Sequence, residues 1–249
     1  MKMFLLFTFL LSLAALARAE TFDASTNSNA SYLRGIDVSH YQGSIDWQKV
    51  AGSGIRFACA KATEGNTYVD KTFATNWKGM HAAGIVRCAY HFARPASNAT
   101  SQALHFVQTV QNAGGYASSK TLQLMLDLET NDKLGPKAVW AWVQEFVGEI
   151  KRLTGRPAII YTGYYFWNGQ VGAPTDNLDC PLWVASYTHP APAGIPKAWP
   201  SGWTFWQYND NGASAPGGAA GHIPGVSGKS VDVDYFKYSA ATLAKFCFP

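Results

Sequence analysis

The sequence predicts an α/β protein, built as an irregular TIM-like (β/α)5(β)3 barrel in a single domain. Three observations lead to this prediction. Five short apolar runs alternate with amphipathic stretches, an order typical of a parallel sheet with helical crossovers. Three further strand-like runs follow, and the segments between them are rich in Pro, Gly and Ala rather than helical. The chain has 249 residues, a size at which barrels commonly fold as one domain.

The start of the chain has the pattern of a secretory signal peptide over residues 1–19. Lys2 supplies a positive charge, an apolar run follows, and the residues A-R-A form a small-x-small cleavage pattern. The apolar run is short for a membrane span, which needs roughly 20 residues. We therefore expect a secreted, extracellular protein with a polar, disordered leader at 20–31 and the folded domain at 32–249.

The first half of the predicted barrel contains three pairs of strand and helix. The strand-like runs are residues 33–38, 56–62 and 85–92, and the helical stretches after them are residues 45–54, 71–83 and 101–112. Gly54 ends the first helical stretch and Gly84 follows the second. Glycine commonly ends helices, so both positions support the predicted boundaries.

The second half begins with a fourth strand at 122–129, which is apolar until its last residues. Pro136 opens a long helix to about Leu153, with Gly155 just beyond its end, and residues 157–163 form the fifth strand. The three irregular strands are residues 181–187, 202–208 and 230–236. A doubly wound open sheet is the alternative fold, but no Gly-rich phosphate loop follows the first strand.

Charge and motif content argue against several function classes. The formal net charge is +4, and removal of Lys2 and Arg18 with the signal peptide leaves +2. So small a charge gives little general attraction to nucleic acid or to membranes. The sequence has no G-x-S-x-G turn and no histidine pair with metal-ligand spacing. We expect no metal, no cofactor and a monomeric protein.

Four cysteines, Cys59, Cys88, Cys180 and Cys247, raise the question of disulfides. An even number in an exported protein predicts disulfide bonds. A bridge between Cys180 and Cys247 would tie down the C-terminal tail, and Cys59 and Cys88 occupy similar places in consecutive strands. The geometry of a disulfide is narrow, so the pairing stays open.

Acidic residues gather at strand ends, where the active site of a β/α barrel lies. Asp37 ends the first strand, Asp127 and Glu129 end the fourth, and Asp232 and Asp234 lie in the last. One residue separates Asp127 from Glu129, so both side chains point to the same face of a strand. Two close carboxyl groups do not both ionise easily, and glycoside hydrolysis needs one proton donor beside one negative group. Such a pair also caps helices or binds calcium elsewhere, so the pair alone does not decide the function.

Aromatic side chains near the same strand ends favour a carbohydrate groove. They are Tyr90, Tyr161, Tyr187, Trp206 and Tyr208. Such rings stack on sugar faces, and tyrosine adds a hydroxyl for hydrogen bonds. Each ring alone is more often a core residue, but together with the clustered acids they favour sugar binding.

The chain resembles glycoside hydrolase family 25, the Chalaropsis-type lysozymes or N,O-diacetylmuramidases. The segments that carry the resemblance are, in order, RGIDVSHYQGSIDWQKV, RFACAKATEGNTYVD, VRCAYHFARP, LMLDLE, IIYTGYYFW, PLWVASY, FWQY and VDVDYF. They extend from Arg34 to Phe236. The opening D-V-S-H-Y-Q-G and the K-A-T-E-G run are more specific to the family than D-x-E, and we expect a secreted, fungal member.

The resemblance implies a barrel enzyme that cleaves the β-1,4 bond between N-acetylmuramic acid and N-acetylglucosamine in bacterial peptidoglycan. It implies Glu129 as general acid and Asp127 as its partner, with Asp37 and Asp232 completing an acidic ring. Asp232 is preferred to Asp234 because it matches the family's V-D-x-[ND]-x-F pattern. The residues expected to contact the sugar are Tyr90, Tyr161, Tyr187 and Trp206. Family members retain the anomeric configuration, and we favour participation of the substrate's acetamido group assisted by Asp127.

Two other functions stay open at this stage. A chitinase-like or endo-N-acetylglucosaminidase barrel also carries D-x-E on its fourth strand, but usually has another Asp at the place of Met125. A non-catalytic carbohydrate-binding protein on the same barrel usually lacks one of the acids, and none of the four is missing here.

Overall fold

Strand and helix signals alternate along the chain, and they fold into a closed barrel. The computed structural model describes residues 32–188, 190–210, 222–227 and 230–249, and residues from Tyr32 to Pro249 form one unit. The strands are β1 Leu33–Val38, β2 Ile55–Glu64, β3 Tyr68–Val69, β4 Val86–Phe92, β5 Met125–Asp127, β6 Ile159–Gly163, β7 Leu182–Ala185, β8 Phe205–Asn209 and β9 Asp232–Phe236. The helices are α1 Trp47–Gly52, α2 Phe73–Ala82, α3 Ala99–Asn112, α4 Pro136–Thr154, α5 Tyr164–Gln170 and α6 Ala240–Leu243, with 3-10 turns at His40–Gln42 and Ala244–Phe246.

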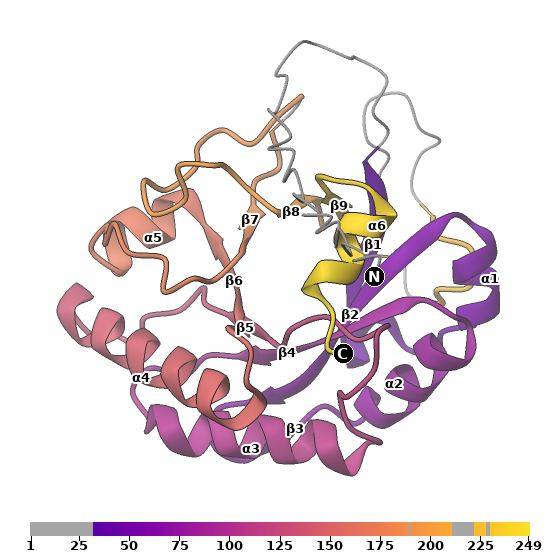
Figure 1. Ribbon diagram of the computed structural model, residues 1–249, viewed down its shortest axis with the longest axis horizontal. Coiled ribbons are helices and arrows are strands. Elements are labelled where there is room, and N and C mark those ends of the chain that lie inside the picture. Colours follow the sequence, from indigo (N-terminus) through magenta and orange to yellow (C-terminus); the bar gives the residue numbers. More distant parts are fainter. Residues whose placement is uncertain (1–31, 189, 211–221, 228–229) are drawn as a thin grey trace, which may run out of the picture. The chain divides into compact units, whose positions relative to one another are not determined.

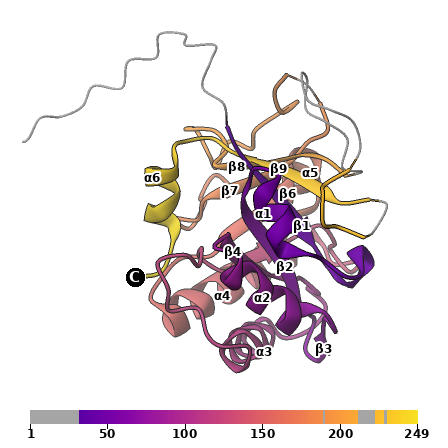
Figure 2. The same ribbon diagram turned by 90° about the vertical axis from the view of Figure 1, so that its right-hand side faces the viewer.

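The strand order around the barrel is β1, β2, β4, β5, β6, β7, β8 and β9, with β9 pairing back to β1. Neighbouring strands from β1 to β8 are parallel, whereas β9 runs antiparallel to both β8 and β1. In the described residues the extra strand β3 forms a hairpin with β2 outside the ring. The helices α2, α3 and α4 lie on the outer side of β2, β4 and β5 (Figures 1 and 2). The predicted irregular barrel is confirmed.

The long helix α4 shows how closely local signals determine an element. Pro136 lies in its first turn, and Gly155 ends it in a left-handed conformation with φ of 73°. Proline has no N–H to leave unpaired in the first turn, and glycine adopts positive φ without a steric cost. One face of the helix buries Val139, Val143 and Phe146 against the barrel.

Several elements differ from the prediction. The strand β5 covers only Met125–Asp127 of the predicted 122–129, because Leu122 makes an isolated antiparallel bridge with Cys247 instead. The helix α5 follows β6 directly and has no side-chain cap, so its aromatic sequence YYFWNGQ carried no start signal. The short helix α6 near the C-terminus also escaped prediction.

Side chains alternate between the interior of the barrel and the layer beneath the helices. The interior is filled by large rings, among them Phe57, Trp183, Phe205 and Phe236. Trp183 and Phe205 stack with ring centroids 4.7 Å apart. Gly35 belongs to this interior because a Cβ there would lie 2.3 Å from the Phe57 ring. The interior is therefore a packed core, and the polar residues lie above it at one end.

All four cysteines are buried free thiols, so the expected disulfides are absent from the structure. Cys59 and Cys88 are register partners on β2 and β4, and the Cys88 thiol donates to the carbonyls of Ala89 and Gln123. Cys180 packs in the layer beneath the helices, whereas Cys247 packs in the barrel interior. Each of these two thiols donates to a carbonyl of its own segment, Leu178 and Leu243 respectively. Cys180 and Cys247 thus lie on opposite sides of the sheet, so the bridge expected to tie down the tail does not form.

In the part of the chain that the structure describes, no helix combines the length and the apolar character that crossing a bilayer would require. The predicted signal peptide and leader lie outside the described residues.

Candidate active site

One rim of the barrel collects the acids and tyrosines predicted from the sequence. Parallel strands bring their carboxyl ends to this rim, which is where β/α barrels place their chemistry. The strand β9 runs the other way, so it is its first residue, Asp232, that reaches the rim opposite Asp37. Interior positions at or near the rim belong to Asp37 on β1, Lys61 on β2, Tyr90 on β4, Asp127 on β5, Tyr161 on β6, Gln207 on β8 and Asp232 on β9.

Asp37 and Asp232 form a hydrogen-bonded pair of carboxyl groups. Burial raises the pKa of Asp37 to about 6, against the lowering effect of hydrogen bonds from Gln207 and Asp232. Burial and the Asp37 charge raise the pKa of Asp232 to about 9. The pair therefore shares one proton near neutral pH, and the hydrogen bond from Gln207 favours Asp37 as the ionised partner.

Gln207 connects Asp37 to two tyrosines. Its Nε2 donates to Asp37 Oδ2 over 2.7 Å, and its Oε1 accepts from Tyr161 OH at 2.8 Å and Tyr187 OH at 3.0 Å. Tyr161 is almost fully buried, whereas Tyr187, just after β7, is about half exposed. Gln207 thus joins three segments of the rim in one network.

Asp127 and Glu129 lie on the same side, as the spacing predicted, but in different surroundings. Asp127 is buried, and its Oδ1 has no hydrogen-bond partner among the described residues. Burial, then the charge of Glu129, raises the pKa of Asp127 well above its usual value. Solvent reaches Glu129, yet the protein around its carboxyl also raises its pKa, while Lys61 opposes this.

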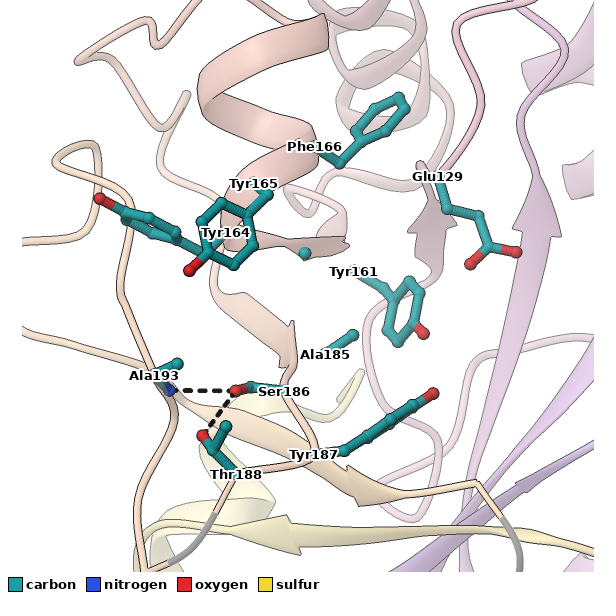
Figure 3. A pocket seen from close by; sticks show the side chains of 11 residues that line it. Glu129, Tyr161, Tyr164, Tyr165, Phe166, Ala185, Ser186, Tyr187, Thr188 and Ala193 are labelled. Atoms are coloured by element: carbon teal, nitrogen blue, oxygen red, sulfur yellow. Dashed lines mark hydrogen bonds between the residues drawn. The ribbon is translucent and has the colours of Figure 1, made fainter.

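A cleft of about 380 Å³ opens beside Glu129. Figure 3 shows Glu129, Tyr161 and Tyr187 on one side of this cleft, with Tyr164 and Tyr165 from the start of α5 on the other. Tyr165 is 79% exposed, which is unusual for so large a ring. An acid between exposed aromatic rings suits a sugar, whose faces stack on rings and whose hydroxyls hydrogen-bond.

Two groups of site residues were not singled out from the sequence. Lys61 is nearly buried, and its Nζ contacts Glu64 Oε2 at 2.6 Å, while Glu64 also binds Arg94. The K-A-T-E run held the signal, because a lysine inside an apolar strand needs a nearby acid. Gln207 was missed as well. Strand alternation turns Phe205 and Gln207 of F-W-Q-Y into the barrel interior, and Gln207 is the polar residue of the two.

The structure brings most predicted residues to the rim, but not Trp206. Tyr90 lies near Asp37 and Asp127, whose charges with burial raise the pKa of its hydroxyl. Asp234 lies one layer below Asp232 and accepts a 2.9 Å hydrogen bond from Trp183 Nε1. Trp206 is 1% exposed in the layer beneath the helices, and its Nε1 donates to Ser186 O. Strand alternation puts it on the face opposite to Gln207.

Metal binding receives no support from the described residues, in which no group of three or more His, Cys, Asp or Glu is arranged to hold an ion.

Comparison with known proteins agrees with this geometry. The sequence profile of Glycosyl hydrolases family 25 matches residues 36–217. The chain is 40% identical to Lysozyme M1 of Streptomyces globisporus over 225 residues, which cover 87% of this chain and 71% of that protein. It is 32% identical to the N,O-diacetylmuramidase of Chalaropsis sp over 205 residues, 78% of this chain and 94% of the relative.

A solved structure shares the fold as well. The bacterial lysozyme from Streptomyces coelicolor superposes with a TM-score of 0.77 at 37% identity, covering 88% of this chain and 98% of that one. The family profile matches the part of the chain that carries Asp37, Asp127 and Glu129, and the solved structure and the two relatives cover most of the chain. The chain therefore belongs to glycosyl hydrolases family 25 and is a glycoside hydrolase.

Proposed function

We propose that this protein is a secreted lysozyme, a 1,4-β-N-acetylmuramidase that hydrolyses the bond between N-acetylmuramic acid and N-acetylglucosamine in bacterial peptidoglycan. Relatives named lysozyme and N,O-diacetylmuramidase support this substrate. The observation that carries the proposal is the difference between the two neighbouring acids. Asp127 is buried, whereas Glu129 lines the cleft.

Glu129 is the general acid in this proposal. A general acid must hold a proton near the working pH and must reach the oxygen that leaves. Glu129 lines the cleft, and the surrounding protein raises the pKa of its carboxyl. Both conditions are therefore met by the same residue.

Asp127 assists the substrate's own acetamido group in a retaining mechanism. Its buried Oδ1 has no donor among the described residues. An acetamido N–H that donates to the Asp127 carboxyl would supply a hydrogen bond that the described residues do not, and it would favour the ionised form of Asp127. The proton that the acid pair shares then resides on Glu129, where it is needed. A covalent sugar ester on Asp127 in a trapped intermediate would contradict this mechanism.

The remaining rim residues hold the sugar and set the local charge. Asp37 and Asp232 form the opposite wall of the acidic ring, with one proton between them. Tyr90, Tyr161 and Tyr187 supply rings and hydroxyls for the sugar. The buried Trp206 has no part in this set.

Secretion and domain organisation belong to the same proposal. We infer a signal peptide at 1–19, a leader at 20–31 and the catalytic barrel at 32–249, acting as a monomer. N-terminal sequencing of protein from the culture medium tests the cleavage site, and light scattering tests the oligomeric state. A mature chain that starts at Met1, or a dimer in solution, would correct these points.

The deciding experiment is reducing-end release from purified peptidoglycan, with products identified by mass. We expect N-acetylmuramic acid at the new reducing end, and a loss of rate by on the order of 10²-fold or more in Glu129→Gln, because that change removes the general acid. N-acetylglucosamine at that end would instead favour the endo-N-acetylglucosaminidase alternative. Binding of peptidoglycan without release by the wild type would favour a binding protein.

A further inference from the structure

Gln207 occupies a position in the rim that the proposed mechanism leaves unexplained. It is 3% exposed, yet all three of its side-chain hydrogen bonds go to residues of the site rather than to its own strand. Its partners come from β1, from β6 and from the segment after β7. A buried amide with every bond directed at the site is arranged to hold those partners in place.

The direction of each bond limits what the tyrosines can offer a ligand. A phenol carries one proton, and both Tyr161 and Tyr187 donate theirs to Gln207 Oε1. Both rings line the cleft, so the hydroxyl lone pairs that remain serve as acceptors there. Tyr161 and Tyr187 together form the part of the cleft that we call the cleft floor. This floor therefore suits groups that donate hydrogen bonds, such as an amide N–H or a sugar O–H.

The charge of Asp37 decides which way the amide points. With Nε2 toward Asp37, the amide donates to a carboxylate over 2.7 Å. The reverse orientation would place the amide oxygen against the same carboxylate and free both phenol protons to face the cleft. An ionised Asp37 excludes that reverse orientation, because two acceptors would then meet in a buried site.

We propose that Gln207 is a positioning residue of the muramidase reaction: its amide fixes Tyr161 and Tyr187 as hydrogen-bond acceptors for the sugar, and it holds Asp37 as a carboxylate. This inference rests on the proposed function and deepens it, because it names what the cleft floor recognises. Gln207 itself acts through the three side chains that it binds.

Asp37 faces titratable groups from every side of the barrel, and these define the background for the test. Those whose electrostatic interactions link them to Asp37 are Asp232 and Asp234 on β9, Cys59 on β2, Tyr90 on β4, Asp127 and Glu129 at the end of β5, Tyr161 on β6 and Tyr187 after β7. All are acids, whereas the Gln207 amide donates to Asp37 without titrating. Loss of this donor raises the pKa of Asp37.

Three variants separate the two halves of the proposal, measured as kcat and KM against pH on a soluble muramic acid–glucosamine tetrasaccharide. Gln207→Met removes both halves, so we expect KM to rise roughly 10-fold. Because the proposal requires Asp37 as a carboxylate, we also expect the acid limb of the pH profile to move up by about one pH unit. Gln207→Glu keeps an oxygen that accepts from both tyrosines but places a second titrating carboxyl against Asp37, so we expect the acid limb to move, whereas KM stays as long as the two carboxyls share one proton. Tyr187→Phe removes one acceptor, so KM rises and the limb stays.

Clear outcomes overturn the proposal. A merely structural role predicts an equal loss of kcat/KM at every pH in Gln207→Met, with the limb unmoved. A KM that rises as much in Gln207→Glu as in Gln207→Met would refute the acceptor role. Should Gln207→Met fail to fold, Gln207→Glu and Tyr187→Phe still test each half.

Direct binding keeps this inference distinct from the proposed function. Titration calorimetry of the same tetrasaccharide, in a Glu129→Gln background, needs no turnover. An unchanged Kd on adding Gln207→Met would overturn the acceptor role even if the wild type proves to be a muramidase. A wild type that releases no muramic acid end would refute the proposed function, and the Kd would still decide whether Gln207 orients the cleft floor.

Discussion

Buried carboxyl groups with raised pKa values are the main feature of this protein at the scale of single residues. Desolvation is the largest cause for Asp37, Asp127, Asp232 and Asp234. Each also faces at least one other acid, which further disfavours its charged form. In the part of the chain that the structure describes, Lys61 is the cation whose charge lowers the pKa of both Asp127 and Glu129.

Replacement of Lys61 tests that electrostatic role. Lys61→Met removes the positive charge, so the pKa of Glu129 rises and its carboxyl stays protonated to higher pH. We expect the basic limb of the kcat/KM profile to move up by about one pH unit. Glu64 keeps its hydrogen bonds from Arg94 in this variant, so its carboxylate is not left unpaired and we expect the variant to fold. An unmoved basic limb would show that another group sets it.

Asp234 offers a pH test of stability rather than activity. Its pKa in the fold lies well above the usual 3.8, so above pH 3.8 the unfolded chain loses a proton that the folded chain keeps. The folded state binds more protons, and its stability therefore falls as pH rises, by up to about 1.4 kcal/mol per pH unit for one group.

Asp234→Asn removes this titration and still presents a carbonyl to Trp183. We expect the variant to gain stability relative to the wild type when denaturant unfolding is compared at pH 4 and pH 8. Two parallel stability curves would mean that Asp234 is ionised in the fold.

At the scale of elements, strand parity determines which residues reach the site. Asp37, Asp127 and Asp232 could be predicted because each stands at a strand end, and alternation turns Asp127 and Glu129 to one face. Gln207 was missed and Trp206 was included because aromatic residues were counted by nearness to a strand end. Strand alternation along F-W-Q-Y turns Gln207 into the barrel and Trp206 away from it. Counting by alternation would therefore have included Gln207 and left out Trp206. The helix α5 and its Tyr165 escaped prediction because no capping residue marks its start.

The contact of Gly35 with Phe57 makes β1 sensitive to one methyl group. A Cβ at Gly35 would lie 2.3 Å from the Phe57 ring, inside a core with no room to shift. We expect Gly35→Ala to lower the free energy of unfolding by about 1–3 kcal/mol, the usual cost of overpacking. Gly52→Ala is the control, because nothing lies within 4 Å of a Cβ there. Equal stability of the two variants in urea would contradict the contact.

At the scale of the whole molecule, the barrel holds together without covalent links between its strands. The four thiols are buried and free, and the rings stacked inside the barrel provide the packing that a disulfide would otherwise reinforce. We expect a thiol reagent to label no cysteine in the native protein and four after unfolding, with a Tm that a reducing agent leaves unchanged. Fewer than four labelled thiols in denaturant, restored by reduction, would reveal a bridge.

The antiparallel strand β9 has a consequence for how the protein is made. Asp37 and Asp232 meet only when β1 pairs with β9, which is synthesised much later than β1. Contacts so distant in sequence form late, since a long loop must close first. A nascent chain that ends before Asp232 lacks both the closing strand and half of the acid pair. If the proposed acid pair is needed for hydrolysis, we expect hydrolytic competence to arise in one step with closure of the ring.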